Sequence, residues 1–127
     1  VTSESNPAQL IGALLGKAST MLKRAVLVLR TESMQSPDWE IRLKAAEDLN
    51  LSIGKAMDIV SALKNLLDLE NGKELAAQLE ETYSSILAGI WRASKEKDQV
   101  SLQKLSQALD ELKEAWNQIS KMSVVNT

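Results

Sequence analysis

The chain has 127 residues, and its 15 basic and 17 acidic side chains leave a formal net charge of −2. Because a surface that follows nucleic acid phosphates usually needs a basic excess, this balance disfavours nucleic acid as a partner. Cysteine and histidine are absent, which excludes disulfides, thiolate catalysis and metal sites built from these residues. Only two prolines and five glycines interrupt the chain, so its long periodic segments predict an all-α protein.

The first half of the chain predicts two long amphipathic helices. We expect residues 1–5 to be flexible, a first helix over about 7–31 and a second over about 37–67. The pairs Asn6-Pro7 and Ser36-Pro37 would start them, since a polar cap followed by proline is typical of a helix N-terminus. Apolar residues recur every three or four positions in both segments and predict a buried face on each.

The second half predicts two more helices of the same kind. Asn71-Gly72 predicts a turn, followed by a helix over about 73–95 whose expected buried face includes Leu75, Tyr83 and Ile90. Asp98 is the expected N-cap of a last helix over about 99–120, with residues 122–127 frayed. Short links between long helices predict an antiparallel up-down four-helix bundle in one domain, 1–127.

Some apolar residues lie off these core faces and form a candidate partner-binding surface. By helical-wheel arithmetic they fall about 100° or more from the core stripe on the second helix, with two more off the line of the third. They are Leu51, Ile59, Ala62, Leu66, Leu87 and Trp91. Three interpretations stay open: the edge of the core, a groove for an amphipathic partner helix, or a homodimer contact.

Catalytic chemistry finds little support in this composition. Without His or Cys the candidates are carboxylates, lysines and hydroxyls, and adjacent acidic pairs such as Glu80-Glu81 point about 100° apart on a helix. No glycine-rich phosphate loop appears. We therefore expect no enzyme activity, no cofactor and no metal. The start of the chain has no signal-peptide pattern, and no apolar run could insert into a membrane, so we expect a cytoplasmic protein.

Four segments together resemble one known family, the flagellar secretion chaperones of the FliS type. Residues 6–11 (NPAQLI) are similar to its helix-opening S-P-E-Q-L-I, and residues 53–60 (IGKAMDIV) to its I-x-K-A-x-x-I-I. Residues 67–76 (LDLENGKELA) are similar to its L-D-x-E-x-G-G-E-I-A, and residues 109–116 (LDELKEAW) to its closing helix. One departure is Leu15, where the family has an aromatic hydroxyl.

The resemblance implies a four-helix chaperone of the bacterial cytosol that binds the disordered C-terminal segment of flagellin. Such a chaperone would block premature polymerisation and present its client to the flagellar type III export apparatus. A disordered client that folds on the bundle would bury its apolar helix faces against the surplus apolar surface. The alternative is a divergent bundle that binds a different helical client or self-associates, and monomer and weak homodimer both stay open.

Overall fold

The computed structural model describes the backbone of residues 7–126 and the side chains of residues 7–118. Over this range it contains α1 (Pro7–Arg30), the 3-10 turn η2 (Ser33–Gln35), α2 (Trp39–Asn65), α3 (Leu69–Glu96) and α4 (Gln99–Asn126), and no strand. The predicted all-α arrangement of four helices is confirmed. The residues expected to be flexible at the N-terminus, the expected cap Asn6 and the final residue Thr127 lie outside the described range.

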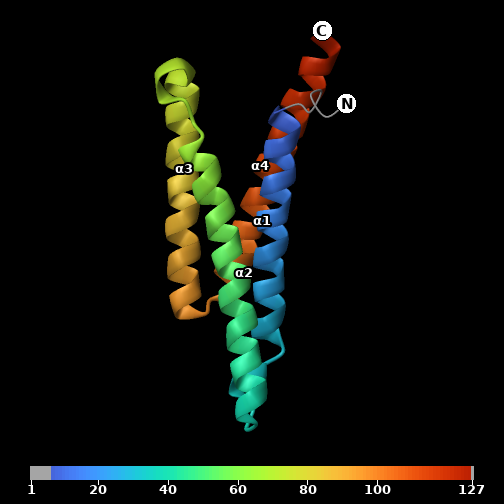
Figure 1. The fold of residues 1–127 in the computed structure, drawn as a ribbon, viewed down its shortest axis with the longest axis vertical. Helices are drawn as coiled ribbons and strands as arrows, with labels where there is room; N and C mark the ends of the chain where they lie inside the picture. Colours follow the sequence, from blue (N-terminus) through green and yellow to red (C-terminus); the bar gives the residue numbers. More distant parts are fainter. Residues whose placement is uncertain (1–6, 127) are drawn as a thin grey trace.

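Each helix packs against the next one in the chain, and α4 returns to pack against α1. The seam between α1 and α4 is the most extensive one, whereas the backbones of α1 and α3 do not approach each other closely in the described range. Figure 1 shows α3 on the far side of α2 from α1. Gly12 and Gly16 face Asn117 and Lys113, and Arg30 contacts Gln103, so α1 and α4 run in opposite directions.

The core lies where the predicted apolar faces of the four helices meet. Its members include the fully buried Leu15, Leu22, Val60, Tyr83, Ile90, Leu102 and Leu109. Burial raises the pKa of the Tyr83 hydroxyl, although a hydrogen bond with Trp116 opposes this shift. Leu75 was expected on the buried face of α3, but it is exposed, and its neighbour Ala76 is buried. By helical-wheel arithmetic Leu75 lies at the edge of the face that contains Ala76 and Tyr83.

The start of α2 differs from the prediction by two residues. The helix begins at Trp39 because Asp38, and not Ser36, provides the cap. The Asp38 carboxylate accepts a hydrogen bond from the backbone N–H of Glu40 at 2.9 Å. The Ser36 hydroxyl instead accepts from the N–H of Asp38 at 3.1 Å, which fixes the turn before the helix. A side-chain cap thus overrides the proline signal at position 37.

The predicted turn at Asn71-Gly72 is a kink inside α3, which begins earlier than expected, at Leu69. Asp68 caps this first turn by accepting hydrogen bonds from the backbone N–H and the side-chain amide of Asn71, at 3.1 and 2.7 Å. The kink lies at Lys73, whose φ of 49° and ψ of −125° leave the helical region. A Cβ on Gly72 would lie 2.6 Å from the Cβ of Ala76, so the kink also requires glycine there.

Replacement of Lys73 by glycine is expected to stabilise the protein. The backbone of Lys73 has a conformation that glycine adopts freely, and a non-glycine residue there costs on the order of 1–3 kcal/mol. After the larger entropy loss of glycine on folding, we expect a net gain of about 1 kcal/mol, or roughly 4 °C in thermal melting. The motif that residues 67–76 resemble has glycine at this position.

Lys97→Gly is the matched control for this substitution. Lys97 also has a positive φ, but its φ of 52° and ψ of 43° lie in the left-handed helical region, which side chains tolerate at lower cost. Its gain should therefore be smaller. Equal gains at Lys73 and Lys97 would show that the unusual ψ of Lys73 carries no extra strain.

The start of α4 confirms the predicted cap at Asp98. Its carboxylate accepts hydrogen bonds from the Ser101 backbone N–H at 3.1 Å and the Ser101 hydroxyl at 2.7 Å. At the other end α4 extends to Asn126, beyond the expected end at about residue 120 and through most of the segment that we expected to be frayed.

The Asp98 cap predicts a pH-dependent contribution to stability. The hydrogen bonds from Ser101 hold the pKa of Asp98 below its ordinary value of 3.8. A lowered folded-state pKa stabilises the fold above the unfolded-state pKa, and this stability disappears as the pH falls through the folded-state value. We expect Asp98→Ala to lower the melting temperature at neutral pH and to match the parent chain well below pH 3.8. Asp58→Ala, an exposed change within α2, is the control and should show no such convergence.

Candidate functional site

A groove with a volume of about 880 Å³ lies between the second half of α1 and the first half of α2. Its lining combines apolar side chains with charged side chains of both signs. The apolar residues are Leu27, Val28, Ile41, Ala45 and Leu51, and the charged ones are Arg24, Asp38, Glu40, Lys44 and Asp48. A groove with this lining can hold an amphipathic segment that buries its apolar side.

The exposed leucines of this groove make it a site for apolar contact. Leu27 and Leu51 lie on different helices, and each has about 60% of its surface exposed. Lys44 and Asp48 pair with each other on the wall formed by α2, with Nζ and Oδ1 3.4 Å apart. These exposed charges already have a partner, so they add little electrostatic field to the groove. The distinguishing feature of the groove is therefore its exposed apolar surface.

The predicted partner-binding residues on α2 have different degrees of burial. Leu51 lines the groove, whereas Ile59 is half-buried and packs against the core. Ala62 is exposed, and Leu66, at the C-terminal cap of α2, has 76% of its surface exposed. Helical-wheel arithmetic places all four within about 80° on α2, on the side that faces the groove. They therefore continue the apolar wall of the groove toward the end of the helix.

The two predicted residues on α3 belong to a separate surface. Leu87 is half-buried against the core, and Trp91 has 55% of its surface exposed. The Nζ atom of Lys95 lies 4.3 Å from the centroid of the Trp91 ring, one helical turn away. Neither Leu87 nor Trp91 lines the groove that contains Leu51. The structure thus brings the α2 residues together and leaves the α3 pair apart from them.

Sequence reasoning did not assign α1 to the candidate site. Leu27 and Val28 of α1 form the wall opposite Leu51, and Leu27 also borders a smaller groove of about 390 Å³ between α1 and α4. The available signal was the position of Leu27, which lies off the apolar stripe of its helix. Periodicity identifies such a residue as exposed, but it does not say which neighbouring helix completes a groove beside it.

Two further findings bear on the class of protein. No helix in the described range is both long and apolar enough to cross a membrane. Residues 1–123 match the family model described as "Flagellar protein FliS".

The curated relatives found by sequence comparison have the same kind of name. The chain is 30% identical over 118 residues to "Flagellar secretion chaperone FliSB" of Pseudomonas aeruginosa, which covers 93% of this chain and 84% of the relative. It is 29% identical over 117 residues to "Flagellar secretion chaperone FliS" of Salmonella typhimurium, with 91% and 78% covered. A shorter match to "Flagellar secretion chaperone FliS" of Vibrio cholerae is 33% identical over 67 residues, or 53% of this chain and 49% of the relative.

Proposed function

We propose a function for this chain from one premise: it belongs to the FliS family of flagellar proteins. Membership supports a role as a flagellar export chaperone, the role that the names of its relatives give to them. The client in our proposal is flagellin, and the bound part is the disordered C-terminal segment of flagellin. The activity is binding without chemical conversion, so it needs no catalytic residue and no cofactor.

The observation that carries the proposal is the exposed apolar wall along α2 and its groove with α1. Leu51 and Leu66 leave more than half of their surfaces uncovered, although a large leucine on a helix of a folded domain is usually buried. A disordered segment that folds into a helix on this wall would bury its own apolar face. Ordering the segment costs part of the binding energy, so the complex stays releasable.

The chaperone mechanism follows from what the bound segment can no longer do. A flagellin segment held as a helix on the groove cannot pair with another flagellin subunit, which prevents premature polymerisation in the cytoplasm. The client-binding surface in our proposal is the α2 wall of Leu51, Ile59, Ala62 and Leu66 together with Leu27 opposite it in the groove. Leu87 and Trp91 form a second contact surface for the client on α3. The complex would then deliver flagellin to the flagellar type III export apparatus.

Calorimetry with two forms of flagellin tests the client and its segment. We expect intact flagellin to bind with a negative heat-capacity change, which is the marker of apolar burial. Flagellin without its C-terminal segment should give no heat of binding. Equal binding of both forms would overturn the proposed segment, and binding of neither form would overturn the proposed client.

A self-associating bundle is the alternative that the same exposed leucines allow. If α2 pairs with α2 of a second copy, the mass measured by analytical ultracentrifugation rises with protein concentration. Flagellin then either fails to bind or competes with the second copy for α2. A constant monomer mass together with flagellin binding favours the chaperone.

A further inference from the structure

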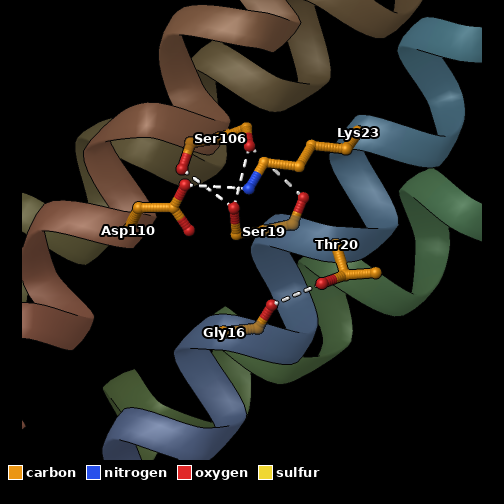
Figure 2. Close-up of polar contacts among 6 residues, drawn as sticks. All are labelled: Gly16, Ser19, Thr20, Lys23, Ser106 and Asp110. Carbon is orange, nitrogen blue, oxygen red and sulfur yellow. Dashed lines mark hydrogen bonds and ion pairs between the residues drawn. The ribbon is translucent and has the colours of Figure 1, made fainter.

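Two serine hydroxyls lie inside the seam between α1 and α4. Ser19 and Ser106 each have only 1% of their surface exposed. The Ser19 hydroxyl donates to the backbone carbonyl of Ser106 at 3.0 Å, and the two hydroxyl oxygens are 2.8 Å apart. The Ser106 hydroxyl in turn lies 3.4 Å from the carbonyl of Ser19. Each helix therefore contacts the backbone of the other through a short polar side chain (Figure 2).

An ion pair lies beside the serines. Lys23 follows Ser19 by one turn on α1 and Asp110 follows Ser106 by one turn on α4, and because the helices are antiparallel the two side chains reach toward each other across the serine pair. The Nζ atom of Lys23 on α1 lies 2.9 Å from an Asp110 carboxylate oxygen on α4. Burial pushes the pKa of Asp110 upward, but hydrogen bonds and the charge of Lys23 outweigh it and hold the pKa below 3.8. Figure 2 shows the Lys23–Asp110 pair next to the Ser19–Ser106 pair in the seam. The polar contacts thus extend from the core to the surface.

Apolar packing alone does not fix how far α4 slides along α1. The leucines of α4 repeat every three or four residues, at 102, 105, 109 and 112. A slip of seven residues places Leu109 where Leu102 was and Leu112 where Leu105 was. The apolar surface buried in such a slipped pair is nearly the same, because the burial energy depends on area and not on identity. Another interaction has to distinguish the registers.

The serine pair distinguishes them because only one register satisfies both hydroxyls. A slip of four residues would place either Leu102 or Asp110 opposite Ser19. With Leu102 there, the buried Ser19 hydroxyl has no partner on α4. With Asp110 there, a carboxylate moves into the core, and both changes are unfavourable. A slip of seven residues would place Gln99 or Lys113 there, and both are too long for a position as tightly enclosed as that of Ser106.

We propose that Ser19 and Ser106, with Lys23 and Asp110, form a register lock that selects a single alignment of α1 and α4. The lock raises the free energy of misaligned registers but adds little to the stability of the correct one. A buried, mutually hydrogen-bonded pair of hydroxyls contributes about as much to the free energy of folding as two apolar side chains would. It also fixes the α1–α4 groove, whose lining includes Lys23, Ser106 and Asp110.

The test removes both hydroxyls at once, by Ser19→Ala with Ser106→Ala, so that neither is left without its partner. Spin labels on cysteines introduced at Lys17 and Lys104 report the register, and the absence of natural cysteine makes the labelling specific. The two positions are offset along the seam, so a slip changes the distance between the labels. We expect a second distance population in the double variant. The seven-residue slip that preserves the leucine seam moves α4 by about 10 Å along α1, so the distance between the labels changes by up to that amount.

Ser85→Ala, an exposed change on α3, is the control in the same labelled chain and should give the single parental distance. Thermal melting followed by circular dichroism establishes that each variant is folded. A folded double variant with one unchanged distance would overturn the lock. A double variant that no longer folds would overturn it as well, because the hydroxyls would then support the fold itself and not its register.

Discussion

Leu66→Lys is expected to weaken flagellin binding at least tenfold and to leave the helical content unchanged. Leu66 has 76% of its surface exposed, so the fold loses little packing when the residue changes. A positive charge near the C-terminus of α2 is also compatible with the helix dipole. In the complex, however, the lysine would have to be desolvated against an apolar client face. A tenfold loss corresponds to about 1.4 kcal/mol, the size expected for an interface residue of moderate importance.

Val100→Lys is the matched control for Leu66→Lys, because Val100 is also exposed, at 61% against 76% for Leu66, but lies on α4 and outside the client-binding surface. It is expected to bind flagellin as the parent chain does. Calorimetry measures both affinities, and circular dichroism verifies the helices. If Leu66→Lys binds with parental affinity, the client does not use the end of α2. If both variants lose binding equally, the effect comes from net charge and not from a particular surface.

The buried faces of the helices could be predicted because their physical cause is local. Leu15, Leu22 and Ala25 recur with the period of a helix, and any partner surface buries such a face. The boundaries were less predictable because a few side-chain hydrogen bonds set them. Asp38 and Asp68 each cap a helix that the nearby proline or glycine had placed elsewhere. Whether an aspartate caps depends on the turn before it, which periodicity does not describe.

The candidate site was predictable on one helix and not between helices. Leu51 and Leu66 stand out in the sequence because they lie off the core face of α2. The contribution of Leu27 depends on how α1 and α2 lie side by side, which is a tertiary feature. Ile59 and Leu87 also lie off the core faces, yet both are half-buried because neighbouring helices cover them. A single helical wheel has no information about that cover.

The buried serines could have been identified in part from the sequence, although the apolar periodicity alone does not identify them. Ser19 lies between Ala18 and Leu22 on the core face of α1, where a polar residue requires a partner. A search for polar residues on predicted core faces would have found it. Identifying Ser106 as the partner of Ser19 required knowing how α1 and α4 are aligned. That alignment is what we propose the serine pair selects.

Leu22→Ala is expected to cause the larger loss of stability, about 3 kcal/mol, because it removes a fully buried side chain and leaves a cavity in the core. For a chain of this length, this corresponds to a fall of roughly 10 °C in melting temperature. Leu27→Ala makes the same chemical change five residues later on α1, but at an exposed position in the groove.

Thermal melting and calorimetry on this pair separate the two faces of α1. Leu27→Ala should melt within about 2 °C of the parent chain, since an exposed leucine contributes little packing, and it should weaken flagellin binding. Leu22→Ala should melt far earlier and bind normally at temperatures where it remains folded. The same fall in melting temperature for both variants would contradict the division of α1 into a core face and a client face, because that division requires the effects to be opposite.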